Sequence, residues 1–200
     1  MLSKQKSPLL AVSRIRKLEP RLPTALEGLP ITLRDTWIGA AGTRFELRPI
    51  EASDFPLLES FARRLSFRTR YFRFGRGSFE LGADQIRRLC NPDPAYSVHL
   101  IVINEAKAQP SIVGFGRIVY EPGEKQSELT LTVSDSWQRR GVGRRLLDHL
   151  IEAARQRGDS KITARILATN QPMLALVTRH GFTLSNSDQG PEVKFAQLCL

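Results

Sequence analysis

One stretch of the chain, residues 128–147, restricts its fold more than any other. Alternating polar and apolar residues predict a strand over Glu128–Val133, and leucines at helical spacing predict a helix that begins near Gly143. The loop between them is glycine-rich and basic: Gln138-Arg139-Arg140-Gly141-Val142-Gly143-Arg144. Unpaired N–H groups converge at a helix start, the helix dipole adds partial positive charge, and glycines allow a ligand to approach closely. The stretch therefore predicts a site for a diphosphate or a similar anion.

Two common phosphate-binding motifs do not fit this loop. A nucleotide P-loop requires Gly-Lys followed by Ser or Thr, and the dinucleotide fingerprint requires a further glycine. Another glycine pair, in Gly114-Phe115-Gly116, falls inside a predicted strand, where we interpret it as a β-bulge. Residues 138–144 are therefore the expected anion site.

The first half of the chain predicts a hairpin followed by two helices. Alternating residues indicate strands at 31–34 and 45–48, with glycines between them for the turn. Ser53 is a suitable N-cap for a helix that continues to about Leu65, and a shorter helix is expected over Ala83–Leu89. The basic and aromatic segment 67–74 is interpreted as a connection between these helices.

The second half predicts a sheet with helices packed on it. Strands are expected at 98–103, 112–120, 128–133, 161–167 and 193–198. One helix follows Gly143 and ends at Gly158, and another begins at Asn170 and ends at Gly181. The order predicts an α+β architecture with one central sheet and a parallel step around the helix that follows Gly143.

The composition indicates one domain and a basic extension. The net charge is +10 and the sequence pI is near 10.3. Residues 1–29 contribute about +4 of this charge and carry three prolines without periodicity, so we expect a flexible extension followed by a domain over residues 30–200. No apolar run reaches the roughly 18 residues of a membrane span, and we expect a soluble, cytoplasmic protein that does not bind membranes.

No metal site is expected. The two cysteines, Cys90 and Cys199, are far apart, and the three histidines fall on different predicted elements without the spacing of metal ligands. A reducing compartment is consistent with this cysteine content.

Two segments resemble the cofactor-binding motifs of the GNAT acetyltransferases. The run Gln138-Arg139-Arg140-Gly141-Val142-Gly143 resembles the family motif Q/R-x-x-G-x-G/A, and the segment from Asn170 to Gly181-Phe182 is similar to its second cofactor segment. The resemblance implies a central mixed, mostly antiparallel twisted sheet flanked by about four helices, with acetyl-CoA as cosubstrate. The cofactor-binding residues implied are Leu131, Thr132, Val133, Gln138, Arg139, Arg140, Gly141, Val142, Gly143, Arg144 and Asn170.

The resemblance extends to the acetyltransferase module of bacterial protein lysine acetyltransferases. It is carried by residues 31–35, Leu47-Arg-Pro-Ile, Arg64-Leu-Ser and Arg70-Tyr-Phe-Arg-Phe, and it runs from about Pro30 to the C-terminus. It implies that the acceptor amine is a protein lysine. It implies no oligomeric state.

Glu128 matches the position of the family's proposed general base. Strand alternation independently separates Glu128 from Leu129, and about 16 to 17 Å of strand lies between Glu128 and Val133. Because an ammonium must lose a proton before it attacks a thioester, Glu128 is the expected base and an N–H near Val133 the expected oxyanion donor. The alternative is an ordinary strand-end carboxylate that faces water. Many relatives have a tyrosine acid where this chain has Val177, so the acid remains unassigned.

Three other functions are alternatives. The chain could acetylate a small amine, although a basic surface repels polyamines and suits acidic proteins better. It could bind nucleic acid through the arginines and aromatic residues of 63–76, but such aromatics more often pack on a core. We therefore expect that Arg68, Arg70, Arg73 and Arg76 do not mainly form a nucleic-acid groove; a role in shaping the acceptor entrance is the alternative. A CoA-binding regulator without catalysis is the third alternative, and the presence of Glu128 argues against it.

Overall fold

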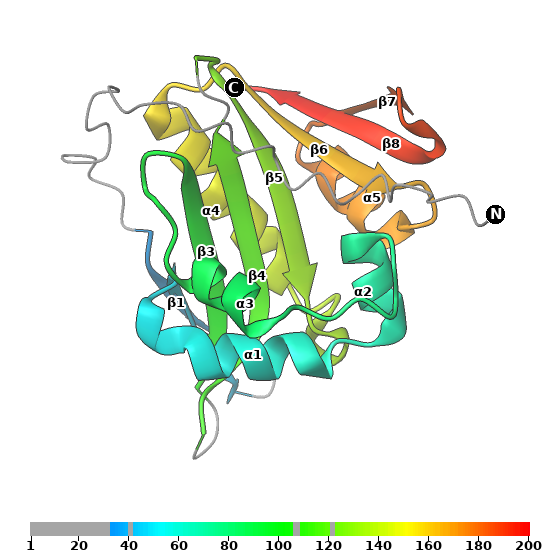
Figure 1. The fold of residues 1–200 in the computed structure, drawn as a ribbon. Coiled ribbons are helices and arrows are strands. Elements are labelled where there is room, and N and C mark those ends of the chain that lie inside the picture. The colour runs from blue at the N-terminus through cyan, green and yellow to red at the C-terminus, as the bar shows by residue number, and fades with distance from the viewer. Residues whose placement is uncertain (1–32, 40–41, 106–108, 121–122) are drawn as a thin grey trace.

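The structure, a computed structural model, describes residues 33–39, 42–105, 109–120 and 123–200. Its strands form one sheet in the order β1-β2-β3-β4-β5-β6-β8-β7 (Figure 1). The strands are β1 (Asp35–Ile38), β2 (Arg44–Pro49), β3 (Ser97–Asn104), β4 (Ser111–Tyr120), β5 (Gln126–Val133), β6 (Lys161–Leu167), β7 (Thr183–Ser187) and β8 (Gly190–Cys199). The helices are α1 (Phe55–Arg64), α2 (Phe67–Phe74), α3 (Ala83–Cys90), α4 (Val142–Arg157) and α5 (Gln171–Arg179). The predicted basic extension, residues 1–29, lies outside the described residues.

The sheet is antiparallel at every junction except one. Strands β5 and β6 pair in parallel, and α4 connects them, which confirms the predicted parallel step. The other six pairings are antiparallel. The predicted fold class, a mixed and mostly antiparallel sheet covered by helices, is therefore confirmed.

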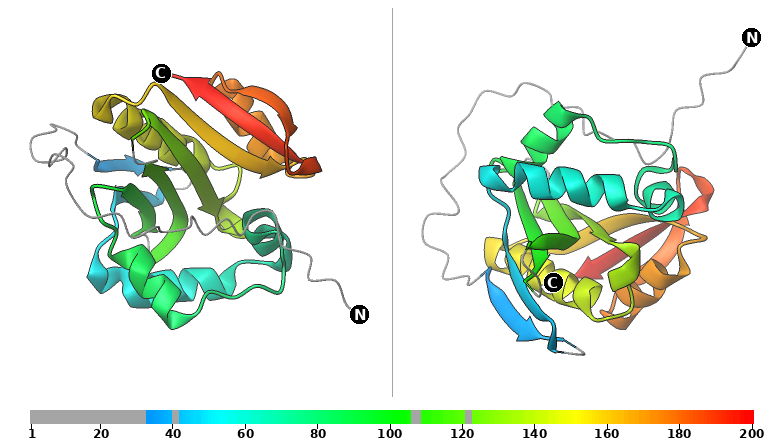
Figure 2. Two further views of the ribbon diagram at one scale, coloured as in Figure 1. Left: turned by 45° about the horizontal axis from the view of Figure 1, so that its top comes forward. Right: turned by 90° about the horizontal axis from the view of Figure 1, so that it is seen from below.

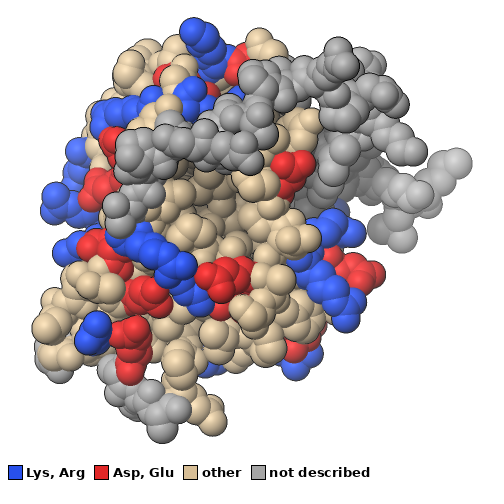
Figure 3. All heavy atoms as spheres, turned by 90° about the vertical axis from the view of Figure 1, so that its left-hand side faces the viewer, with Lys and Arg blue, Asp and Glu red and all other residues tan. Residues whose placement is uncertain are grey.

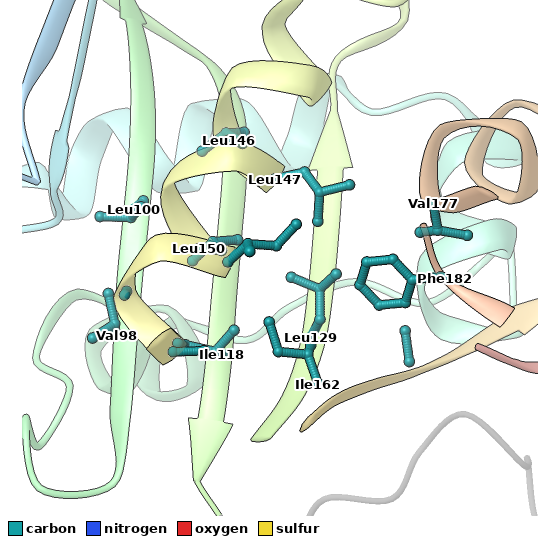
Figure 4. Close-up of a cluster of buried hydrophobic side chains, with 14 of the residues drawn as sticks. Val98, Leu100, Ile118, Leu129, Leu146, Leu147, Leu150, Ile162, Val177 and Phe182 are labelled. Carbon is teal, nitrogen blue, oxygen red and sulfur yellow. The ribbon is translucent and has the colours of Figure 1, made fainter. Parts of the chain in front are cut away.

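Helices cover both faces of the sheet. Helices α1, α2 and α3 lie on one face, and α4 and α5 lie on the other (Figures 1 and 2). On the α4 face, leucines of α4 pack between the apolar side chains of β3, β4 and β5 (Figure 4). A second buried cluster joins α1 and α3 to the opposite face. None of the helices in the described part of the chain has the length and apolar character of a membrane span.

The glycines of β4 allow α4 to lie close to the sheet. A β-carbon at Gly114 would be 2.8 Å from a methyl of Val142, and one at Gly116 would be 2.8 Å from a methyl of Leu150. The register irregularity between β3 and β4 falls next to Gly114, because Val102 pairs with Gly114 and Ile103 with Ile112. A bulge is therefore present where it was predicted, but close helix packing is the stronger reason for these glycines.

The first strand was predicted too early. It covers Asp35–Ile38 and pairs with Arg44–Leu47, whereas Leu33 and Arg34 are outside it. The turn explains the shift, because the Gly39 N–H donates to the Thr43 carbonyl at 2.8 Å and pairing begins directly at this tight turn. Residues 31 and 32 lie outside the described residues.

The segment interpreted as a connection is a helix, α2. The Ser66 side chain accepts a hydrogen bond from the Thr69 N–H and caps the N-terminus, and Gly75 ends the helix with a φ of 69°. Both signals are visible in the sequence, but the alternating arginine and aromatic residues obscured them. Helix α2 brings the described helices to five, against the expected four or so.

Candidate active site

The predicted anion site forms a tight loop between β5 and α4. A short 3-10 helix, Asp135–Trp137, follows β5, and the glycine loop (residues 138–144) leads into α4. Arg139 and Gly141 take left-handed backbone angles, with φ of 59° and 87°. Because the N–H of Arg145 donates to the Gly141 carbonyl at 3.1 Å, the preceding N–H groups of Val142, Gly143 and Arg144 have no acceptor within the helix.

Neighbouring atoms leave room for a side chain at both glycines of this loop. A β-carbon at Gly141 would meet no atom within 4 Å, and one at Gly143 would meet only ordinary contacts at 3.5 Å, from Leu176 and Val133. Gly141 is required by its positive φ, but neither backbone angle nor packing requires glycine at position 143. Glycine there would let a ligand approach the main chain closely, and a row of free amides is suited to a diphosphate.

Of the other side chains of the loop, one makes hydrogen bonds to neighbouring elements and the three arginines are exposed to solvent. Gln138 donates to the Val133 carbonyl at 3.1 Å and to the Thr69 hydroxyl of α2 at 3.2 Å. Arg140 lies over the ring of Trp137, and Arg144 is 3.7 Å from Asp148. Arg139, Arg140 and Arg144 are exposed and add positive charge in front of the amides.

Asp135 fixes the glycine loop to helix α2. Its carboxylate accepts hydrogen bonds from the Ser66 N–H at 3.0 Å, the Ser66 hydroxyl at 2.6 Å and the Thr69 hydroxyl at 2.8 Å. Burial raises the pKa of Asp135, but these hydrogen bonds outweigh burial and lower it overall. The loop position is therefore coupled to the N-terminus of α2, a contact that the sequence analysis missed.

Asn170 caps helix α5 beside the loop. Its side-chain oxygen accepts from the Met173 N–H at 3.3 Å. Leu176 of the same helix lies close to Gly143. The sequence prediction that Asn170 opens a helix near the cofactor segment is therefore confirmed for the helix, and its side-chain oxygen serves as an N-cap.

Strand β5 separates from β6 partway along its length. The two strands pair only from Gln126–Lys161 to Glu128–Thr163, although β6 continues to pair with β8 up to Leu167. Figure 1 shows the two strands diverging toward the glycine loop. Among the described residues, Leu129–Val133 therefore has no strand partner on its β6 side, and we name this side the open edge of β5.

The open edge presents main-chain donors. The Ser134 N–H donates to Val113 of β4, so strand alternation directs the N–H groups of Val133 and Leu131 toward the open edge. By the same alternation Thr132 directs its N–H toward β4, and its side chain is buried. Val133 therefore occupies the position at which an oxyanion donor was expected.

Glu128 lies at the last paired position, where the open edge begins. It is on the sheet face opposite buried Leu129, as alternation predicted, and its side chain is 32% exposed. Arg165 of β6 donates to its carboxylate at 3.1 Å. On the same face, the Thr130 hydroxyl accepts from Arg117 of β4 at 3.3 Å and from Arg73 of α2 at 3.4 Å.

Three guanidinium groups therefore lie near one carboxylate: Arg165 contacts Glu128 itself, and Arg73 and Arg117 contact Thr130, two residues along the strand. We name these three arginines the arginine cluster. Burial and the neighbouring Arg117 charge lower the pKa of Arg73 to about 9, against the opposing effect of Glu128. Burial also lowers the pKa of Arg117, and Glu128 again opposes the shift. The sequence analysis did not find this cluster, since its members come from α2, β4 and β6.

Val177 cannot contribute to chemistry at this site. It is fully buried and packs beside Phe182 in the α4-side core (Figure 4). Across the described residues, no group of three His, Cys, Asp or Glu side chains is arranged to hold a metal ion.

Comparison with known proteins identifies the family. The sequence profile described as the Acetyltransferase (GNAT) family matches residues 60–182, a range that includes Glu128 and the glycine loop. The chain belongs to this family of GNAT acetyltransferases. It is therefore an acyltransferase that transfers acetyl groups to an amine nitrogen.

Two curated relatives support the assignment. Acetyltransferase PA5475 of Pseudomonas aeruginosa is 28% identical over 150 residues, which are 74% of this chain and 81% of that protein. Acetyltransferase Pat of Mycolicibacterium smegmatis is 27% identical over 177 residues, which are 88% of this chain and 50% of Pat. The chain thus spans half the length of Pat.

Solved structures share the GNAT fold. The GNAT domain of S. lividans PAT superposes with a TM-score of 0.75 and 24% identity, over 86% of this chain and 99% of that one. RimL, a ribosomal L7/L12 α-N-protein acetyltransferase in complex with coenzyme A, has a TM-score of 0.65 and 16% identity, over 83% of this chain and 98% of that one. These likenesses establish the fold.

Proposed function

We propose that this GNAT protein transfers the acetyl group of acetyl-CoA to a protein lysine, with Glu128 as general base. One observation carries the proposal. Glu128 lies where β5 leaves β6, and the strand edge that becomes free there leads directly to the glycine loop. The proposed anion site, oxyanion donor and base would thus follow one another along one strand.

The residues would divide the reaction between them. Amides of Val142, Gly143 and Arg144 would bind the pyrophosphate, and the Val133 N–H would donate to the thioester oxygen. The acceptor nitrogen attacks the carbonyl carbon, the carbon–sulfur bond breaks, and Glu128 receives the nitrogen's proton. The thiolate leaves and is protonated by solvent. The coenzyme A bound to RimL supports acetyl-CoA as the cosubstrate.

A protein lysine is the acceptor favoured by the similarity to Pat and to the S. lividans PAT domain. An N-terminal α-amine is the second candidate, because RimL is an α-N-protein acetyltransferase of the same fold. Both acceptors are primary amines that must lose a proton before attack, so the same base serves either.

A proteome assay tests the function. Bacterial extract depleted of small molecules is incubated with acetyl-CoA and the protein, and acetylated peptides are quantified by mass spectrometry. We expect new acetyl groups on lysine side chains with the wild type and few with Glu128→Gln. If only N-termini are acetylated, the acceptor is the α-amine and not the lysine side chain. If no protein is acetylated, the acceptor is not a protein.

Nucleic-acid binding by the arginines of 63–76 finds less support. Helix α2 directs Arg73 toward Thr130 of the sheet, and Arg70 lies 3.3 Å from Glu80. On the side of the molecule away from α2, basic and acidic groups are intermixed (Figure 3), so the described residues of that side present no continuous basic surface either. Gel-shift titration over a salt series would revive this function only if tight binding weakened, and its salt slope fell, when these arginines were neutralised.

A further inference from the structure

Two arginines on the Glu128 face make no direct contact with a carboxylate among the described residues, although the charge of nearby Glu128 acts on both. Arg73 and Arg117 share a single neutral acceptor, the Thr130 hydroxyl, at 3.4 and 3.3 Å. Arg165 already donates to Glu128, and its buried Nε atom has no acceptor in the described part of the chain. Each guanidinium carries five N–H donors, so most donors of this cluster are unused by the protein.

Another arginine shows how this chain holds a purely structural guanidinium. Arg48 binds Asp54 with two hydrogen bonds of 2.7 Å, and Asp54 is also held by the Glu51 N–H at 2.8 Å. That pair is bidentate and closed, as expected for a half-buried charge. Arg73 and Arg117 have no such carboxylate, although burial opposes their charge.

The pair also lies near the proposed base. Arg117 is on β4, next to Thr130 of β5, and Arg73 reaches the same hydroxyl from α2. Thr130 and Glu128 lie on one face of β5, two residues apart, so the guanidinium groups are neighbours of the proposed base. An anion bound by them would lie beside the reacting amine.

We propose that Arg73 and Arg117 bind a carboxylate of the acceptor, next to the amine that Glu128 deprotonates. This inference rests on the proposed function and defines its substrate class: an amine that carries a nearby carboxylate. Planar guanidinium groups suit this role because they bind carboxylates in a bidentate manner.

Charge balance favours such an acceptor. The cluster sets three positive charges against the single negative charge of Glu128, so an incoming ammonium without an anion is repelled. A carboxylate on the acceptor offsets this repulsion and satisfies unused donors. The carboxylate has two chemical sources, an acidic residue beside a lysine in a peptide or the α-carboxylate of a free amino acid.

Matched acceptors test the proposal. One pair is a lysine peptide with glutamate on both sides of the lysine and its glutamine counterpart, and the other is free lysine and lysinamide. We expect kcat/KM to be about ten- to a hundredfold higher for the carboxylate member of one pair. The pair that discriminates identifies the source of the carboxylate.

Variants of the two arginines then test whether they cause the preference for the carboxylate acceptor. Arg73→Gln and Arg117→Gln should each remove most of the discrimination, mainly by raising KM for the carboxylate acceptor. The kcat/KM for the neutral acceptor should not fall, because each variant removes one charge that repels its ammonium. Arg155→Gln, which removes the same charge from the opposite side of the sheet, should keep the preference. Arg73 lies on a surface helix, so its variant remains informative if Arg117→Gln folds poorly.

Three outcomes would overturn the proposal. Equal kcat/KM within both pairs would remove the carboxylate site while leaving the acetyltransferase function intact. If both arginine variants keep the discrimination between acceptors, the carboxylate binds to other residues. If no acceptor is turned over, binding of the acetylated product peptides is measured by calorimetric titration. Equal affinity for the glutamate and glutamine products would then rule out the carboxylate site.

Discussion

The two ends of β5 are built in different ways. At its C-terminal end the glycine loop offers main-chain amides from consecutive residues, and atoms around its two glycines leave room for a β-carbon. At its other end Glu128 and Thr130 are contacted by side chains from α2, β4 and β6. One end uses the backbone of a single segment, and the other uses side chains that only the folded chain brings together.

This difference teaches what each end can recognise. A backbone site is insensitive to most substitutions and suits a ligand common to a whole family, such as a diphosphate. A side-chain site can differ from protein to protein, so acceptor specificity belongs at the Glu128 end. The following predictions separate the two ends, beginning with the largest effect.

Glu128→Gln should affect turnover and leave cofactor affinity unchanged. The amide keeps the shape of the side chain but cannot accept the amine proton, so we expect kcat to fall by roughly 10² to 10⁴. Steady-state kinetics and calorimetric titration with acetyl-CoA measure the two effects. Raising the pH should partly restore the rate, because solvent then supplies free amine. Wild-type turnover at neutral pH would instead make Glu128 an ordinary strand-end carboxylate.

Gly141→Asp should affect the opposite end. The new carboxylate would repel a diphosphate at short range, and we expect acetyl-CoA affinity to fall about a hundredfold. Gly158→Asp is the matched control, because Gly158 ends the same helix with a φ of 82° and also has open space around its β-carbon. Both variants should lose similar stability from backbone strain. Equal acetyl-CoA affinities in the two variants would show that the pyrophosphate does not bind at the glycine loop.

The folding stability of the protein should depend on pH mainly through a histidine near the Glu128 end of β5. His99 pairs across the sheet with Arg117 and donates Nδ1–H to the Leu89 carbonyl at 2.8 Å. Burial lowers the pKa of His99 to about 4, which the Leu89 carbonyl opposes and Arg117 reinforces. The unfolded chain therefore binds more protons between pH 6.5 and 4, and stability falls as the pH falls.

Urea unfolding at pH 7 and pH 5 measures this contribution. We expect His99 to account for roughly 2 kcal/mol of the stability lost between these pH values. His99→Gln keeps a donor for Leu89 but cannot be protonated, so its stability should change less over the same range. Identical losses in the two proteins would show that His99 is not the sensitive group.

Asp135→Asn should weaken both ends slightly. Asp135 joins the glycine loop to the start of α2, the helix that carries Arg73. Losing its charge should cost about 1 kcal/mol of stability and raise KM two- to fivefold for both substrates. Asp84→Asn, on the exposed surface of α3, is the control and should change neither the stability nor the KM values. An effect on only one KM would show that the two ends are independent.

Much of the cofactor end could be predicted because its signals are local. The glycine loop, the start of α4 and the cap of α5 by Asn170 all depend on residues within a few positions of one another. The α2 helix was equally local, with Ser66 and Gly75 as its boundaries, yet the arginine and aromatic pattern led to a different interpretation. The first strand was misplaced because its register depends on the turn at residues 39–43.

The sequence by itself determined the glycine loop at the start of α4 and the face of β5 that carries Glu128, since strand alternation and helix starts are short-range properties. Only the tertiary structure decided what surrounds Glu128. Arg73 is 57 residues from Thr130, and Arg165 is 37 residues from Glu128. Their meeting depends on how α2 packs and where β6 leaves β5 to follow β8. Such contacts follow from strand order and register, which no local pattern contains.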